Sequence, residues 1–399
     1  MTRRVVCLAA LALAARALPM AAQESVFNLP GLGVPSSGET MRARGLGGAG
    51  VGLPGDPFSL EMPAQLVRFG RAGFQLSALG QRLDVENAVG SGQLDDMSFP
   101  MGQAVFPAWE GTSLALGFYQ FVDFEAAVDT DILFEGDTVP GSLRSEGGIT
   151  VLAPAAAWGI DPATSVGGSM DVYLGSRRVV RRIEIGEVSP GGVVASDSLA
   201  RDFRAVGFTL SLERLFGEAA SVGVSWRWRP TIDSEVTEAP GEGLEGTTVE
   251  FGLPSELTVG GSTRLGRRMI GAGVVRWADW SDFEDPDGGE FGSALEIGGG
   301  IEYSPSGRQL LILDAQSPVR VGARWRRLPL RVEGEPVTEW AVTLGYGRRF
   351  VAAWSRLDLV LELGRRGDLD SHGLTERFLR FGLGFSAFEQ WRRDAPNRS

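Results

Sequence analysis

Long stretches of the chain alternate between apolar and polar or small side chains with a period of two. In residues 221–229, four apolar residues occupy every second position. Successive side chains of a β-strand point to opposite faces, so this pattern predicts a strand with one apolar and one polar face. The same alternation recurs in residues 294–303, 319–326, 339–346, 356–363 and 379–386. The sequence therefore predicts an all-β protein.

Two architectures accept such strands. A soluble sandwich or propeller turns the apolar face inward, whereas a membrane barrel turns it toward lipid and keeps a polar lumen. Many segments here are about 10 to 15 residues long, and soluble strands average only about 5–6 residues. Trp and Tyr stand near segment ends, as they do at membrane interfaces, and no blade-like repeat of about 40–50 residues is visible. We therefore predict a transmembrane antiparallel β-barrel.

Fourteen strands are predicted, an even number as in bacterial barrels. Short connections at 160–163, 216–218 and 266–267 alternate with long ones at 124–146, 181–199 and 232–247, which we expect to be outer loops. The predicted strands are residues 66–83, 98–108, 112–124, 146–159, 164–180, 200–214, 219–231, 248–263, 268–283, 293–304, 317–330, 337–349, 354–366 and 376–388.

The two ends of the chain differ from this pattern. Arg3 and Arg4 precede an apolar run, and Ala21 and Ala22 follow it, which is the layout of a secretory signal exported through the Sec pathway. The region before the first strand is rich in Gly and Pro, and a polar tail follows the last strand. We predict a signal peptide (1–22), an N-terminal hatch or plug (23–65), the barrel (66–388) and a periplasmic polar tail (389–399).

Composition narrows the chemistry. The 399 residues include one Cys (Cys7) and one His (His372), too few for a disulfide, a zinc site of the HExxH type or an iron–sulfur cluster. The net charge of −12 disfavours nucleic acid as a partner, because phosphate binding requires cations. No GxSxG motif is present. We expect no enzyme activity, no metal and no cofactor.

The N-terminal region contains Arg42-Ala43-Arg44-Gly45-Leu46-Gly47-Gly48-Ala49-Gly50-Val51, then Met62-Pro63-Ala64-Gln65-Leu66. Leu253-Pro254-Ser255-Glu256-Leu257 and Trp277-Ala278-Asp279-Trp280-Ser281-Asp282-Phe283 follow later. These motifs resemble those of FadL/TodX-type outer-membrane transporters, although Met62 stands where that family has Asn. The resemblance implies a barrel of about 14 strands with an N-terminal lumenal hatch, which would include Gly45, Gly47, Gly48, Gly50, Met62, Pro63 and Ala64.

The resemblance also implies passive uptake of hydrophobic solutes, such as long-chain fatty acids or hydrocarbons, across the outer membrane. The expected partners are the lipid bilayer with lipopolysaccharide, the hydrophobic small molecule, the barrel-assembly machinery and periplasmic chaperones. Two alternatives share the same fold: a PorV-like barrel that serves as shuttle or scaffold for protein secretion, and a non-transport structural protein of the outer membrane. Co-purification of a hydrophobic ligand would favour the uptake channel. Co-purification of secreted cargo would favour the PorV-like shuttle or scaffold.

Ligand-binding residues can be nominated only broadly. Arginines on predicted lumenal faces could hold a carboxylate with two hydrogen bonds, and we nominate Arg227, Arg229 and Arg324. Their alternative role is a ladder of neutralising charges with lumenal acids such as Glu339 and Glu362. The apolar residues Phe134, Ile183 and Ile185 in the predicted outer loops are the other candidates, because exposed apolar groups mark binding surfaces or packing partners.

Overall fold

The computed structural model describes residues 25–29, 32–55, 59–68, 70–88, 90–134, 137–185, 193–238, 246–285, 289–305, 317–350 and 355–389. The predicted signal peptide and all of the predicted tail except Glu389 lie outside these residues, as does Cys7. Within the described part, no helix has the length and hydropathy needed to cross a membrane.

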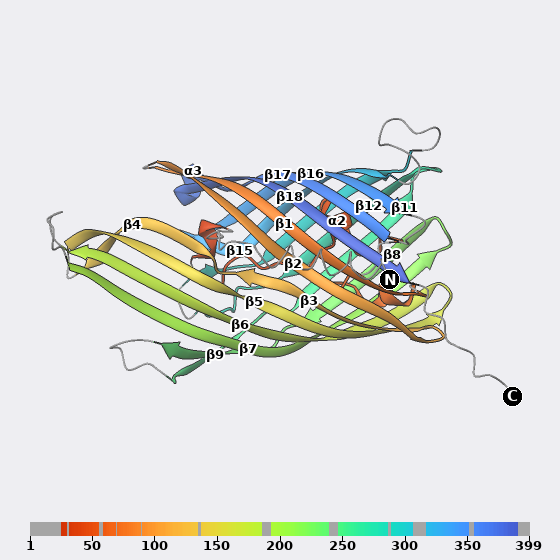
Figure 1. Ribbon diagram of the computed structural model, residues 1–399, viewed down its shortest axis with the longest axis horizontal. Coiled ribbons are helices and arrows are strands. Elements are labelled where there is room, and N and C mark those ends of the chain that lie inside the picture. Colours follow the sequence, from red (N-terminus) through yellow and green to blue (C-terminus); the bar gives the residue numbers. More distant parts are fainter. Residues whose placement is uncertain are drawn as a thin grey trace, which may run out of the picture.

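The strands form one closed antiparallel sheet, in which β1 pairs with both β2 and β18 (Figure 1). Four short segments continue a neighbouring strand: β4 continues β3, β9 continues β8, β11 continues β10 and β14 continues β13. The barrel therefore has 14 strands, as predicted. The segments are β1 (Ala72–Asn87), β2 (Ser91–Trp109), β3 (Thr112–Asp123), β4 (Ala126–Phe134), β5 (Asp137–Asp161), β6 (Thr164–Ile185), β7 (Val193–Phe216), β8 (Ala220–Trp228), β9 (Thr231–Glu238), β10 (Thr248–Gly252), β11 (Glu256–Arg264), β12 (Met269–Ala278), β13 (Glu290–Phe291), β14 (Ala294–Tyr303), β15 (Val319–Val332), β16 (Glu335–Phe350), β17 (Ser355–Asp368) and β18 (Leu374–Glu389).

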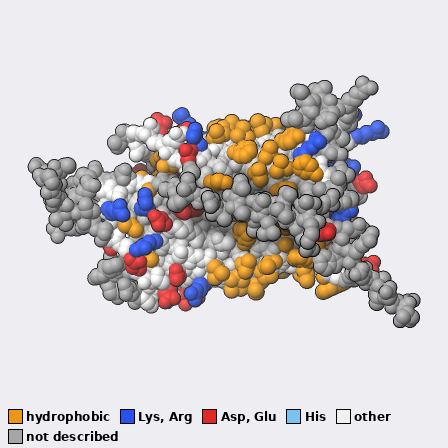
Figure 2. Space-filling model, viewed as in Figure 1, with side chains coloured by type: hydrophobic (Ala, Val, Ile, Leu, Met, Phe, Trp, Pro, Cys, Tyr) orange, Lys and Arg blue, Asp and Glu red, His pale blue; other side chains and the backbone are white. Residues whose placement is uncertain are grey.

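The apolar face of the wall points outward. Leu363 and Phe381 are each 51% exposed and Trp340 is 52% exposed, whereas the alternating polar residues are buried inside. Figure 2 shows the resulting apolar band around part of the barrel, with charged side chains gathered beyond it. Apolar side chains on this scale are stable only against lipid, so the barrel spans a membrane.

The N-terminal residues lie inside the barrel rather than beside it. They form the short helices η1 (Val26–Asn28), α2 (Met41–Arg44) and η2 (Pro63–Arg68), and α2 lies within the outline of the barrel in Figure 1. Thr40 caps α2 by accepting a hydrogen bond from the backbone N–H of Ala43 (3.1 Å). Every residue from Gly38 to Leu53 is buried. We call the described residues between 25 and 68 the lumenal segment.

Several expectations about the elements are wrong. β2 begins at Ser91 rather than at residue 98, and β12 ends at Ala278 rather than at residue 283. Residues 66–71 were predicted to begin the first strand, but the helix η2 extends to Arg68 and β1 begins at Ala72. The predicted outer loops 124–146, 181–199 and 232–247 contain long stretches of strand, since β4 to β7 and β9 continue beyond the apolar band. Strands above the membrane meet water on their outer face, so the apolar and polar alternation that marks the lipid-facing strands is lost there.

The single histidine lies at the outer end of the wall. His372 is part of the short helix α3 (Leu369–His372) and is half-buried. Its Nδ1 accepts a hydrogen bond from the backbone N–H of Asp368 (3.0 Å), and its ring stands edge-on to Phe27 of the lumenal segment. His372 therefore helps to hold the outer end of β17.

Candidate functional site

Glycines in the wall allow the lumenal segment to lie against the strands. A Cβ atom added at Gly167 would come within 2.5 Å of the backbone nitrogen of Ala64, and one at Gly260 would come within 2.8 Å of the side chain of Val51. Gly298 faces the carbonyl oxygen of Gly47 so closely that no side chain fits. The wall glycines that contact the lumenal segment in this way come from strands all around the barrel: Gly117, Gly167, Gly223, Gly260, Gly298, Gly300, Gly322, Gly345, Gly367, Gly382 and Gly384.

The residues nominated for the hatch belong to this contact. Gly45, Gly47, Gly48 and Gly50 are buried just after α2. Met62 is completely buried with its thioether against Gly223, and the backbone N–H of Ala64 donates to Ser211 Oγ (2.8 Å). Met62, at the position where FadL/TodX-type proteins have Asn, therefore packs as an apolar residue against bare backbone.

Ion pairs hold the other side of the lumenal segment. Arg42 donates two hydrogen bonds to the carboxylate of Glu302 (2.9 and 2.8 Å), and Arg320 shares that carboxylate (2.7 Å). Glu39 pairs with Arg44 (2.9 Å) and Arg324 (3.0 Å). These side chains are nearly inaccessible to solvent, so each charge depends on its partners for stabilisation.

The network continues through the wall itself. Arg324 and Arg380 both reach Glu362 (2.7 and 2.8 Å), and Arg366 bridges Glu339 (2.7 Å) and Glu376 (3.2 Å). The hydroxyl of Ser25 donates to Glu376 (2.9 Å) and ties the start of the lumenal segment to β18. The ladder of neutralising charges that the sequence offered as an alternative is therefore present.

Two carboxyl groups of the lumenal segment have shifted pKa values. Burial alone would raise the pKa of Glu39, but the positive charges of Arg44 and Arg324 outweigh it and lower this pKa to about 2. Burial raises the pKa of Glu61, and the ion pair with Arg276 offsets the rise only in part. Arg276 also donates to the carbonyl oxygen of Gly48 (2.8 Å), so it joins two parts of the segment.

The three nominated arginines are all lumenal, but they do not form one site. Arg227 and Arg229 share Glu256 (3.2 and 3.1 Å). Their guanidinium groups lie over the rings of Tyr119 (5.3 Å) and Phe121 (4.9 Å), respectively. Arg324 belongs to the separate network around Glu39. The structure brings Arg227 and Arg229 together and leaves Arg324 apart.

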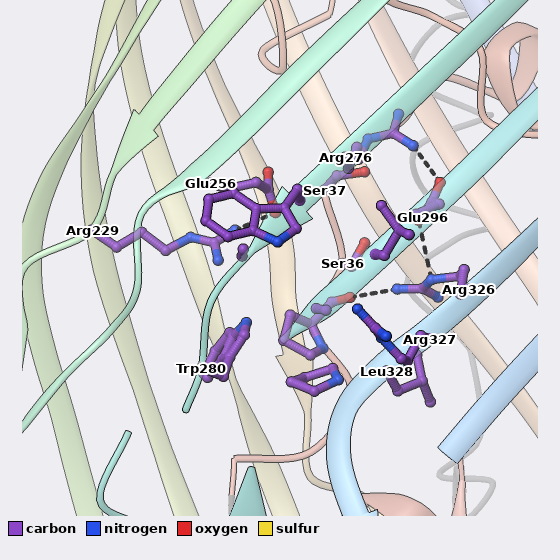
Figure 3. A pocket seen from close by; sticks show the side chains of 16 residues that line it. Ser36, Ser37, Arg229, Glu256, Arg276, Trp280, Glu296, Arg326, Arg327 and Leu328 are labelled. Atoms are coloured by element: carbon purple, nitrogen blue, oxygen red, sulfur yellow. Dashed lines mark hydrogen bonds and ion pairs between the residues drawn. The ribbon is translucent and has the colours of Figure 1, made fainter. Parts of the chain in front are cut away.

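Two cavities lie beside residues 35–37 of the lumenal segment. The first, of about 60 Å³, is lined by Arg229, Glu256, Glu296, Arg326 and the buried Trp280, among others (Figure 3). The second, of about 50 Å³, shares residues 35–37, Glu296 and Arg326 with the first. Its charged lining consists of five arginines and two glutamates: Arg44, Arg324, Arg326, Arg366, Arg380, Glu39 and Glu296.

Aromatic side chains fill the lumen on the outer side of these cavities. The rings of Phe124, Phe203, Phe251 and Phe283 follow one another at centroid distances of 5.7, 6.3 and 5.6 Å, and Trp280 lies 5.3 Å from Phe283. None of these residues was nominated from the sequence. For Phe124, the signal was the run from Gly117 to Phe124, where large apolar residues occupy both faces of one strand.

The apolar candidates from the predicted loops are not part of this cluster as described. Phe134 ends β4, and Ile183 and Ile185 lie at the end of β6. Their side chains lie outside what the structure describes, so their nomination stays a prediction. The acidic stretch near Asp285 holds no group of three metal-ligating side chains among the described residues, and the same is true of the rest of the described chain.

The wall is split on the side of the aromatic cluster. The ladder between β2 and β3 ends at the pair Met101–Tyr119. Beyond it, among the described strands, β2 pairs only with β1, and β4 pairs only with β5, so β2 and β4 diverge toward the outer end (Figure 1). The lumenal segment follows the inner side of this split, where Ser36 donates its N–H to the carbonyl oxygen of Phe121 (2.7 Å).

Solved structures share this architecture. A Pseudomonas aeruginosa FadL homologue superposes with a TM-score of 0.64 at 13% identity, covering 90% of this chain and 100% of the other. The fold is that of the FadL/TodX-type barrels. The toluene transporter TodX of Pseudomonas putida gives 0.59 at 14% identity, with coverages of 90% and 99%, and the monoaromatic hydrocarbon channel CymD gives 0.54 at 14%, with 92% and 100%.

Sequence comparison adds one match. The model of the BamG family matches residues 219–395, which is less than half of the chain and covers β8 to β18. No curated protein matches the sequence. The matched part contains most of the ion-pair network and excludes the split wall.

Proposed function

We propose that the protein is an outer-membrane channel for the passive uptake of hydrophobic solutes, which leave the lumen sideways into the bilayer. The split between β2 and β3/β4 is the observation that carries this proposal. It begins at Met101–Tyr119, close to the exposed apolar side chains of Phe99 and Phe118. A solute that reaches the aromatic cluster would therefore meet lipid without crossing the polar inner half of the lumen.

The lumenal segment would act as a hatch that closes the axial route. Its residues pack against wall glycines from β3 to β18, and its charges are paired with the wall. Moving it would separate several buried ion pairs, and each separation leaves a charge without compensation. Sideways exit avoids that cost, because the aromatic side of the lumen is held by non-directional contacts.

The donor groups of the arginines that line the second cavity favour a solute with an acidic head group, which would compete with the glutamates that already pair with these arginines. Five arginines against two glutamates line the second cavity, and a carboxylate suits the planar, two-pronged donors of Arg. The aromatic cluster would receive the hydrocarbon tail. Long-chain fatty acids therefore fit better than neutral hydrocarbons, with Arg324, which was nominated from the sequence, and Arg326 as the proposed contacts for the head group.

Cross-linking the split tests the route. Ser98→Cys with Gln120→Cys, joined by a bismaleimide, should abolish oleate uptake in a strain that lacks its own fatty-acid transporter. Ala104→Cys with Leu116→Cys, which stand in register on the closed part of the β2–β3 ladder, is the matched control and should retain uptake. Full uptake through the cross-linked split would overturn the lateral route, and absence of uptake by the unmodified protein would overturn the channel.

The match to the BamG family supports a second candidate, a structural role beside the barrel-assembly machinery. That match covers the half of the barrel in which the ion pairs are concentrated, and a firmly plugged barrel suits a scaffold. Affinity purification of the full chain from native membranes separates the two candidates. Stoichiometric recovery of the assembly machinery without bound fatty acid would favour the scaffold, and bound fatty acid without the machinery would favour the channel.

A further inference from the structure

The split leaves two strand edges open in the described sheet. On β2, residues 91–100 have a ladder only with β1, and on β4, residues 126–134 have a ladder only with β5. The open edges are ten and nine residues long. Figure 1 shows β2 and β4 running apart toward the outer end of the barrel, so the open edges do not pair with each other.

Open edges of this length usually attract another strand. Each presents a row of unpaired backbone N–H and C=O groups, and proteins avoid unwanted pairing there with short edges, prolines, bulges or charges. Pro100 stands at the base of the β2 edge, but the nine residues before it contain no proline. Charge is therefore the main device that controls what can pair here.

That charge has one sign. Residues 91–100 and 123–134, which form or adjoin the two open edges, carry six acidic residues and no arginine or lysine. Asp96 on β2 and Asp123 on β3 are only 8% and 7% exposed and stand on opposite sides of the split. Asp95 on β2 is paired with Arg82 (3.0 Å). Like charges on both sides oppose closure of the split onto itself and attract a cationic partner.

We propose that this split is a docking site for an extended, arginine- or lysine-rich segment of a second protein, which adds as a strand to the β2 or β4 edge. Strand addition satisfies the open backbone groups, and alternate basic side chains match the acidic flanks. A metal ion would do neither, and the described acidic residues form no group that could hold one. The inference rests on the proposed function in one respect, since the partner would occupy the opening assigned to the solute.

A synthetic strand tests the site directly. The probe is a fluorescent nine-residue peptide that alternates Arg and Val, titrated against the full barrel in detergent micelles. We expect saturable binding that weakens at least tenfold when the peptide backbone is N-methylated on its pairing face, and likewise when Glu replaces Arg. Equal binding of either control peptide would overturn the proposal, because backbone pairing or charge would then be irrelevant.

Two variants locate the binding. Asp95→Asn with Glu125→Gln removes one charge from each side of the split and should weaken binding at least tenfold. Asp233→Asn with Glu235→Gln removes two exposed charges from β9, which is paired on both sides, and should leave binding unchanged. Equal weakening by both variants would show a general attraction to an acidic barrel and would overturn the site.

Uptake is measured separately in the same preparations. Peptide binding without oleate uptake by the unmodified protein would reject the channel and keep the docking site. Oleate uptake without peptide binding would reject the docking site and keep the channel. If both hold, saturating peptide should reduce uptake by reconstituted barrels, and undiminished uptake would remove the link between the two.

Discussion

The two halves of the lumen hold the N-terminal residues by different means. Along β12 and β14–β18 the contact consists of buried ion pairs, such as Arg42–Glu302 and Arg324–Glu39. Along β2–β7, β9 and β10 it consists mainly of aromatic and aliphatic packing around Tyr119 and Phe203. The Arg68–Glu213 ion pair and the hydrogen bond from Arg177 to the carbonyl oxygen of Leu29 (2.5 Å) are polar contacts on this half. Ion pairs are directional and fix one arrangement, whereas apolar packing tolerates rearrangement. The wall splits on the apolar half, where rearrangement costs least.

The largest effect is expected from a change that prevents the lumenal segment from packing against the ionic half of the wall. Gly298→Leu would place a side chain where the carbonyl oxygen of Gly47 lies, so we expect the segment to be expelled from the ionic half. The change should convert a plugged barrel into an ion-conducting one in planar bilayers. Gly273→Ala on the neighbouring strand β12, where the nearest atom would be 3.7 Å away, should stay closed. A closed Gly298→Leu barrel would mean that the segment is not what blocks the bore.

Removing one cation from the ionic half should have the next largest effect. Arg324→Met leaves Glu39 and Glu362 short of a partner in a buried site, which costs about 3–5 kcal/mol. Urea unfolding in lipid vesicles, followed by tryptophan fluorescence, measures the loss. Arg331→Met at an exposed position should change stability by less than about 0.5 kcal/mol. Comparable losses from both changes would show that the network contributes no special stability.

Acidification should weaken the ionic half through Glu39. Its pKa is about 2 in the folded protein and 4.5 in the unfolded chain, so its contribution to stability is complete above pH 4.5 and is lost as the pH falls from there through 2. Glu39→Gln should therefore destabilise the barrel at pH 6 and cost progressively less between pH 4.5 and pH 2. Unfolding midpoints of both proteins across this range measure the effect. A constant difference would show that Glu39 does not titrate with the network.

The lipid-facing wall could be read from the sequence because lipid imposes a simple rule. Alternation placed β14, β16 and β17 within two residues of their observed ends. It failed for β4 and for the outer parts of β5 to β7, where water lies outside and no single pattern is required. The face to which each side chain of a strand points is fixed by which residues must avoid water, and this depends on whether lipid or water surrounds the strand.

The candidate site was only partly predictable. Lumenal placement of Arg227, Arg229 and Arg324 follows from the strand phase, but their partners come from strands and segments far apart in the sequence, which no local pattern reveals. Tyr119 and Phe121 were missed because an apolar residue on the lumenal face contradicts the alternation rule. Departures from the rule, such as the run 117–124, are where the sequence marks the apolar half.

The smallest effect is expected from a change in the apolar half of the lumen. Phe203→Leu keeps an apolar side chain of similar size in the aromatic cluster, so we expect a loss of about 1 kcal/mol in the same unfolding assay. The barrel should remain non-conducting in planar bilayers, because the ion pairs that hold Arg42 and Glu39 are untouched. A loss as large as that of Arg324→Met would contradict the comparison, since the aromatic cluster would then be as specific as the ionic network and would leave a solute no freedom to displace its rings.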